Sequence, residues 1–366
     1  MDIAKPIPSA APQNKILPLE AARGFAAFAV FLNHSANFGL FNLAIAGRAI
    51  PNFGQEAVIL FFLLSGFVIQ YSFARKSDQS AKRFFFDRFT RIYIPLIPTL
   101  ILSYCIASWV SGFWEDPQGS ALLGNLFMLQ DSANLKPGVI APSYMYNSPL
   151  WSLSYEWWFY TAYFLLFISV KSIKIKTIIV ILSSLAAAAL YSVLPNWILR
   201  VVMYFPIWWI GALAAIYYAN VDKKAQILPL LWASFGTIIA ITAMLIWQAK
   251  PNIGNTSWGV HPLIEIRHFM SAIMMILGLL IWRKIGWAGY RFTLRPFLYI
   301  APISYGFYIC HFPFLQLSPV LEAKVGWALS WAIILPSIIV FSWFLELWLF
   351  PRGRKVLKKI VFSPNQ

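Results

Sequence analysis

Charged residues are scarce in this chain of 366 residues. Only 11% of its residues are Asp, Glu, Lys or Arg, 60% are hydrophobic, and its mean hydropathy is +0.67. Because soluble domains carry about 25% charged residues, this composition excludes a soluble enzyme of this size. The chain is therefore expected to be an integral membrane protein.

Cysteine and the common motifs of soluble chemistry are also few or missing. The two cysteines, Cys105 and Cys310, lie in different apolar stretches, which favours small packing groups over a disulfide framework. The sequence holds no glycine-rich phosphate loop, paired-cysteine metal motif, Gly-x-Ser-x-Gly elbow or internal repeat. Its chemistry must therefore be sought in polar residues within the apolar stretches.

Long apolar runs are what the chain does contain. Since roughly 20 helical residues cross a membrane core, the runs predict about ten spans. These runs are 16–38, 56–73, 92–113, 149–170, 177–194, 201–219, 227–247, 269–282, 297–317 and 327–350. We expect an all-α, polytopic membrane protein with a single transmembrane domain over residues 1–366 and one long loop at 114–148.

The basic residues gather on one side of such a bundle. The chain has 29 Lys and Arg against 13 Asp and Glu, a net charge of +16, and most Lys and Arg fall in alternate connections. The positive-inside rule explains this bias better than binding of nucleic acid does. Both termini are therefore expected in the cytoplasm, as a tail at 1–15 and a basic tail at 351–366.

Ionisable residues inside the apolar runs are the strongest functional signal, because an Arg at a helix centre costs about 2.5–3.5 kcal/mol in a membrane. Arg23 and His34 share the first run, about 16 Å apart along a helix. Glu156 lies in the fourth run and His311 in the ninth. We expect His34, Glu156 and His311 at similar depth near the outer face. The structural alternatives are a hydrogen bond to a neighbouring helix or, for Glu156, solvation.

A second group is basic and cytoplasmic. Arg88 and Arg91 are three residues apart, which puts them on one helix face, and guanidinium groups bind phosphate oxygens bidentately. The alternative is topology control by cations at the membrane surface. That alternative is favoured for Lys82, Arg83 and the run 352–359.

A third group precedes the eighth run. Glu265 and His268 have a spacing that lets a helix hold a metal, with His261 nearby. The spacing alone is weak, so we expect a solvated outer loop and no metal site.

Five segments, in order along the chain, resemble the motifs of membrane-bound acyltransferase family 3. They are 19–27 leading to His34, 61–69, 88–95, 152–160 and 303–313. In the residues of this chain, the family's patterns correspond to Arg23 and His34, to Arg88 and Arg91, to Glu156, and to Ser304, Tyr305, Tyr308 and His311. One departure is Glu20-Ala21-Ala22 where many relatives have Asp-Gly-Leu, and we expect it to change packing more than chemistry.

The resemblance implies transfer of an acyl group, commonly acetyl, from a cytoplasmic acyl-CoA to a sugar hydroxyl. The acceptor would belong to lipopolysaccharide, exopolysaccharide, peptidoglycan or a small glycoside, and the protein to the bacterial inner membrane, with lipid but no nucleic acid as a partner. The implied site residues are His34, Glu156 and Arg23 for catalysis, Arg88 and Arg91 for the donor, and His311, Tyr305 and Ser65 for the substrate.

The implied chemistry leaves one choice open. The neutral imidazole of His34 would act as a general base, with Glu156 orienting it or stabilising its cation. An acyl-histidine intermediate is the other route, and the sequence does not separate the two.

Two other functions remain open on the residues alone. A transporter or flippase of a lipid-linked sugar or small solute would use His34, Glu156 and His311 as a proton relay, although no repeat of two halves is visible in the sequence. A non-catalytic sensor or scaffold would leave Arg88 and Arg91 with a purely topological role.

Overall fold

The computed structural model describes residues 16–40, 53–250 and 256–362, and these are mostly helical. The longer helices are α1 (Leu17–Asn37), α2 (Gly54–Phe73), α3 (Ala81–Ser111), α5 (Trp151–Ser169), α6 (Ile173–Tyr191), α7 (Trp197–Ala219), α8 (Lys224–Ala249), α9 (Leu263–Lys284), α11 (Ser304–Leu315), α13 (Trp327–Trp343) and α14 (Phe350–Phe362). The shorter elements are α4 (Gly119–Leu126), β1 (Gln130–Asp131), β2 (Ala141–Pro142), η1 (Tyr144–Tyr146), η2 (Ser148–Leu150), α10 (Tyr290–Thr293), η4 (Arg295–Tyr299), η5 (Ala301–Ile303), α12 (Ser318–Val325) and the π-helical η6 (Phe344–Leu349).

Seven helical segments in the described residues are long and apolar enough to cross a membrane. They are α2, α3, α6, α7, α8, α9 and the continuous helix 327–362 that α13, η6 and α14 form. The chain is thus an all-α polytopic membrane protein. Helices α1, α5 and α11 coincide with the other predicted spans, but α1 contains charged residues and α11 has only 12 residues. The count of ten spans and the cytoplasmic position of both termini stay predictions.

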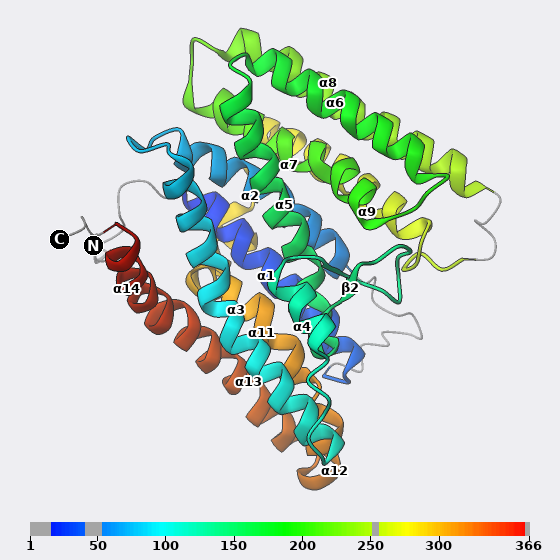
Figure 1. Cartoon of the computed structure of the whole chain (residues 1–366), viewed down its shortest axis with the longest axis vertical. Helices are drawn as coiled ribbons and strands as arrows, with labels where there is room; N and C mark the ends of the chain where they lie inside the picture. The colour runs from blue at the N-terminus through cyan, green and yellow to red at the C-terminus, as the bar shows by residue number, and fades with distance from the viewer. Residues whose placement is uncertain (1–15, 41–52, 251–255, 363–366) are drawn as a thin grey trace, which may run out of the picture.

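The helices pack as two groups that share a middle layer (Figure 1). Helices α6, α7, α8 and α9 pack together at one end, and α3, α11, α13 and α14 at the other. Between them, α1 packs on α2 and α11, while α2 also packs on α7 and α9. Segments far apart in the sequence therefore meet at α1 and α2.

Two glycines bring α2 and α7 into backbone contact. A Cβ atom on Gly66 would lie 1.9 Å from the backbone oxygen of Trp208, and one on Gly211 would lie 2.1 Å from that of Leu63. Such contacts between membrane helices require small residues. The crossing holds Ser65, the neighbour of Gly66, close to α7.

A third glycine brings α1 against the turns that precede α11. A Cβ atom on Gly24 would lie 2.2 Å from the backbone oxygen of Phe297 in η4. Because Arg23 is the adjacent residue, this contact places its guanidinium group beside η5 and the start of α11.

The segment predicted as a loop at 114–148 is a folded unit. It contains α4 and a short parallel pair in which Gln130 of β1 lies opposite Ala141 of β2. Met145 and Tyr146, in η1, have left-handed backbone conformations with φ of 47° and 58°. Polar contacts hold the segment together, because Asn125 donates to the backbone oxygen of Pro142 and accepts from the backbone N–H of Tyr144.

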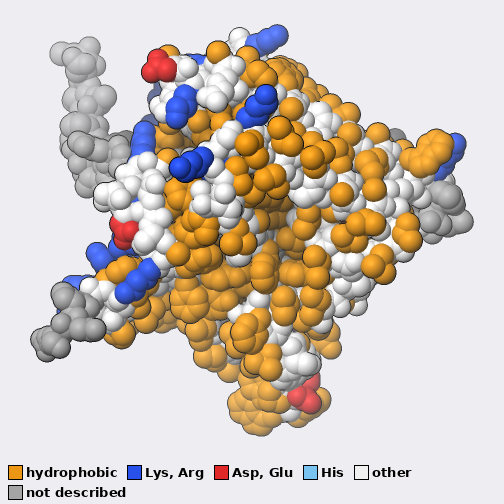
Figure 2. Space-filling view, turned by 45° about the horizontal axis from the view of Figure 1, so that its top comes forward, with side chains coloured by type: hydrophobic (Ala, Val, Ile, Leu, Met, Phe, Trp, Pro, Cys, Tyr) orange, Lys and Arg blue, Asp and Glu red, His pale blue; other side chains and the backbone are white. Residues whose placement is uncertain are grey.

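Apolar side chains cover most of the face seen in Figure 2, as expected for a surface that contacts lipid. Most of the Lys and Arg side chains in that view lie toward its left, the side on which α14 lies in Figure 1. This distribution agrees in direction with the charge bias read from the sequence.

Candidate active site

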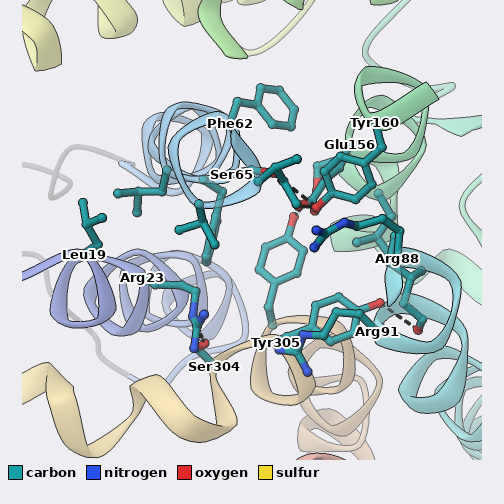
Figure 3. A pocket seen from close by; sticks show the side chains of 18 of the residues that line it. Leu19, Arg23, Phe62, Ser65, Arg88, Arg91, Glu156, Tyr160, Ser304 and Tyr305 are labelled. Atoms are coloured by element: carbon teal, nitrogen blue, oxygen red, sulfur yellow. Dashed lines mark hydrogen bonds between the residues drawn. The ribbon is translucent and has the colours of Figure 1, made fainter. Parts of the chain in front are cut away.

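A cavity of about 200 Å³ lies among α1, α2, α3, α5 and α11. Among the residues that line it are several singled out in the sequence, namely Arg23, Ser65, Arg88, Arg91, Glu156, Ser304, Tyr305 and Tyr308. His34 and His311 do not line it. In Figure 3, Arg88, Glu156 and Tyr160 gather on one side of the cavity, and Arg23 lies with Ser304 on the other.

Glu156 is held by hydroxyl groups. Its Oε1 accepts a hydrogen bond of 2.9 Å from Ser65 Oγ and another from the hydroxyl of Tyr160. Ser65 Oγ in turn accepts a bond of 3.1 Å from the indole nitrogen of Trp208 on α7. Helices α2, α5 and α7 together therefore fix this carboxylate at the cavity wall.

Two of the three titratable residues expected at similar depth are in contact with each other. His34 Nδ1 lies 2.8 Å from His311 Nε2, whereas Glu156 bonds Ser65 and Tyr160 instead. Counting residues from the start of a span gave Glu156 the depth of the histidines. Whether Glu156 shares the depth of the histidines in a membrane stays a prediction.

The two arginines of α3 differ in their partners. Arg91 Nη1 lies 2.5 Å from Glu346 Oε2, and Glu346 Oε1 accepts a 3.0 Å bond from the backbone N–H of Gly306. Arg88 lies over the rings of Phe84 and Tyr160. Its Nε and Nη2 are buried, and neither has a hydrogen-bond partner within the described ranges. Of the two forks expected to bind phosphate, Arg91 is therefore already neutralised.

Arg23 is bonded on three sides. Its guanidinium group donates to Ser304 Oγ at 3.0 Å, to the backbone oxygen of Ala301 at 2.9 Å and to Glu20 Oε2 at 2.8 Å. It thereby ties α1 to η5 and α11. Glu20, which the sequence suggested would mainly alter packing, is the counter-ion of an arginine that lines the cavity.

Tyr305 contacts α3 through both its hydroxyl group and its ring. The hydroxyl donates to the backbone oxygen of Ile92 at 3.1 Å, and the ring lies under the guanidinium group of Arg91 at 4.9 Å. The side chain therefore joins α11 to α3 at the cavity wall.

Glu346 is a site residue that the sequence analysis missed. It lies in η6, a π-helical turn within a long helix, and such turns are rare and frequent at functional sites. Its signal was available, because it is an acidic residue in an otherwise apolar run, as Arg23 is a basic one.

The third group, His261, Glu265 and His268, is not a solvated loop. Glu265 and His268 are both 0% exposed. Glu265 bonds His261 and Tyr191, whereas His268 bonds Tyr204 at 2.7 Å. Among the residues that the structure describes, no group of three or more His, Cys, Asp or Glu side chains is arranged to hold one metal ion. Glu265 therefore contacts α6 through Tyr191, and His268 contacts α7 through Tyr204.

A buried ionic cluster adjoins this group. Asp131 accepts bonds from Arg200 at 2.8 Å and 3.0 Å, from Lys136 at 3.0 Å and from Tyr155 at 2.6 Å. Burial raises the pKa of Asp131, but Lys136 and Arg200 outweigh burial and hold that pKa below its ordinary value. The cluster ties the folded segment to α5 and α7.

Comparison with known proteins identifies the family of the chain. Residues 17–347 match the family described as acyltransferase domain. The chain is 35% identical over 181 residues to a protein named acyltransferase MdmB from Streptomyces mycarofaciens, a match that takes in 47% of this chain and 44% of that relative, so less than half of the relative's length. No solved structure matches. Since the family match runs from α1 into η6 and so includes every element of the cavity, the chain belongs to membrane-bound acyltransferase family 3.

Proposed function

We propose that the protein is an O-acyltransferase that moves an acyl group, acetyl in the simplest case, from acyl-CoA to a hydroxyl of a carbohydrate. The acceptor is a cell-envelope or exported sugar, and the protein resides in the bacterial inner membrane. The observation that carries the proposal is Arg88, a buried guanidinium group whose Nε and Nη2 have no partner in the described parts of the chain. A buried charged donor without a partner is costly unless a ligand supplies one.

Acyl-CoA fits Arg88 by charge, because its phosphates are anionic and a guanidinium group binds phosphate oxygens bidentately. Arg91 would assist donor binding only through its electrostatic field, because its Nη1 is paired with Glu346. The cavity of about 200 Å³ is smaller than the roughly 300–1,000 Å³ of pockets for drug-sized ligands. It therefore suits one part of the donor, with the rest lying outside it.

His34 supplies the base. It lies about 16 Å from Arg23 along α1, which separates the base from the cavity that holds the arginines. Its imidazole removes the proton of the acceptor hydroxyl as the oxygen attacks the thioester carbonyl carbon. The carbon–sulfur bond then breaks, and the proton passes to the sulfur. General base catalysis of this kind contributes typically 10²- to 10⁴-fold.

A proton-coupled transporter is the alternative function. It would need His34, Glu156 and His311 to form a relay. The contacts of Glu156 run to Ser65 and Tyr160 instead, and this favours the enzyme.

The experiment supplies acetyl-CoA with a labelled acetyl group and a panel of carbohydrate acceptors to the purified protein. Free CoA is measured by chromatography, because Cys105 is an exposed free thiol that would react with thiol reagents. We expect labelled acceptor from the wild type and none from His34→Ala, with equal expression of both. Turnover by His34→Ala above a few per cent of the wild-type rate would refute the role of His34 as the base. Uptake of unmodified solute without an acyl donor would refute the proposal that the protein is an enzyme.

A further inference from the structure

The contact between His34 and His311 joins two helices that are far apart in the sequence. His34 Nδ1 on α1 lies 2.8 Å from His311 Nε2 on α11, and His311 Nδ1 lies 3.0 Å from the backbone oxygen of Phe307. His311 is 0% exposed, while His34 is partly buried. Each ring nitrogen of His311 thus has one partner.

These two contacts fix the tautomers of the neutral pair. A carbonyl oxygen only accepts, so the hydrogen between His311 and Phe307 belongs to His311 Nδ1. A neutral imidazole carries one N–H group, and His311 Nε2 is therefore an acceptor. The hydrogen in the 2.8 Å contact must then come from His34 Nδ1. It follows that His34 Nε2 carries no hydrogen and offers a lone pair.

The rings meet in the geometry that such a bond needs. Their planes are inclined by only 16° and their centroids lie 5.1 Å apart. The two nearest nitrogens are 2.8 Å apart, and adding about one ring radius for each imidazole accounts for the distance between the centroids. The rings therefore meet edge to edge and not face to face. The N–H group of His34 therefore points along the lone pair of His311.

Aromatic neighbours hold both rings in place. The ring of Phe31 lies edge-on to His311 at 6.1 Å, and the ring of Phe307 lies 6.3 Å from His311 with its plane inclined by 25°. Phe312 lies edge-on to His34 at 5.1 Å. Rotation of either imidazole would have to displace one of these rings.

We propose that His311 is a positioning residue that holds His34 as the Nδ1–H tautomer and so presents His34 Nε2 as the base. The proposal rests on the acyl transfer proposed above. When Nε2 takes the proton of the acceptor hydroxyl, His34 becomes a cation and its bond to His311 becomes charge-assisted. When Nε2 gives that proton to the sulfur of the departing CoA, both rings are neutral again.

This assignment replaces two expectations. In triads a carboxylate orients the basic histidine, and Glu156 was expected to do so, but the partner observed at His34 Nδ1 is an imidazole. His311 was expected to contact the substrate, whereas its two ring nitrogens are taken by His34 and Phe307.

Two substitutions of His311 separate positioning from packing. His311→Gln keeps an acceptor oxygen near the position of Nε2, while His311→Leu fills a similar space without one. We expect His311→Leu to lower kcat by about 10²- to 10⁴-fold, as loss of the orienting group does in triads, with the KM for acyl-CoA within threefold of the wild type. His311→Gln should keep kcat within about tenfold. Equal kcat values in both variants would overturn the proposal.

The tautomer can be observed directly, because the chain has only 4 histidines. Nitrogen-15 NMR of histidine-labelled protein in bilayers distinguishes N–H from bare ring nitrogens, and His34→Ala and His311→Gln assign the signals. We expect His34 with hydrogen on Nδ1 in the wild type and in His311→Gln, and a loss of that preference in His311→Leu. Hydrogen on His34 Nε2 in the wild type would overturn the proposal.

This measurement does not depend on turnover. The expected tautomer in a protein without acyl transfer would refute the proposed function and leave the histidine geometry standing. Acyl transfer by a protein with hydrogen on His34 Nε2 would support the proposed function and refute the positioning role of His311. If His311→Leu does not fold, the wild-type spectrum alone still decides.

Discussion

Arg91 Nη1 lies 2.5 Å from Glu346 Oε2, so one of the two arginines that α3 presents to the cavity is already neutralised. Arg88, one helical turn earlier, has two buried nitrogens without a hydrogen-bond partner among the described residues. The two arginines therefore have different tasks. Arg91 ties α3 to η6, and Arg88 is the arginine that we propose binds the anionic donor.

The first prediction concerns Arg88. Arg88→Lys keeps the charge but replaces a fork of donors with a point charge. A hydrogen bond to a charged group is worth about 1.5–3 kcal/mol, so the KM for acyl-CoA should rise about 10- to 100-fold, and the thermal midpoint should change little. Arg91→Lys is the matched control and should lower the midpoint more than it weakens donor binding. Identical CoA binding by wild type and Arg88→Lys would show that Arg88 has no role in the donor site.

The second prediction concerns Glu346. Glu346→Gln can still accept the bond from the Gly306 N–H but leaves Arg91 without its counter-charge. Breaking a buried ion pair destabilises a protein by about 3–5 kcal/mol. Because the Arg91 side chain is 31% exposed, we expect Glu346→Gln to lower the free energy of unfolding by about 2–3 kcal/mol. Unfolding in detergent measures this loss. Asp222→Asn, at an exposed position, is the control, and equal stability of the two variants would contradict the role of the pair.

The third prediction concerns the crossing of α2 and α7. Gly66→Ala would place a methyl group 1.9 Å from the backbone oxygen of Trp208, so the helices must separate and Ser65 must move away from Glu156. We expect a loss of about 1–3 kcal/mol in stability and at least a tenfold loss of activity. Gly236→Ala in α8 meets no atom within 4 Å among the described residues. That control should keep full activity. A Gly66→Ala variant with the same activity as the Gly236→Ala control would refute the close contact.

The fourth prediction concerns Asp131 and pH. Asp131→Asn leaves Arg200 and Lys136 buried without their anion, which should cost about 3–5 kcal/mol. Because the folded-state pKa of Asp131 lies below its ordinary value, about 3.9, its stabilising effect is complete above that value and is lost only as pH falls through the folded pKa. The difference in stability between wild type and Asp131→Asn should therefore be the same at pH 5.5 and pH 8. A difference that shrinks at pH 5.5 would show that Asp131 titrates there.

Much of the fold and of the cavity could be predicted from the sequence, because apolar runs and stray charges are local signals. Arg23, Arg88 and Glu156 were found in this way, Ser65 was implied only by the family resemblance, and the structure places all four around one cavity. The family patterns added the order in which they occur.

Partnerships across the fold could not be predicted. His34 and His311 are 277 residues apart in the sequence, and Arg91 and Glu346 are 255 apart. Which charge meets which depends on the glycine contacts that bring α1 against η4 and on the π-helical turn that carries Glu346.

The proposed function, acyl transfer from a cytoplasmic acyl-CoA to a hydroxyl of an exported sugar, is tested most directly by sidedness. Sealed vesicles of known orientation receive labelled acetyl-CoA on one face and carbohydrate acceptor on the other. Since the bias of Lys and Arg predicts that the proposed donor site faces the cytoplasm, labelled product should form only with donor on that face and acceptor on the opposite face. Product formed only when both are on the cytoplasmic face would contradict transfer across the membrane, and accumulation of unmodified solute without donor would contradict the enzyme.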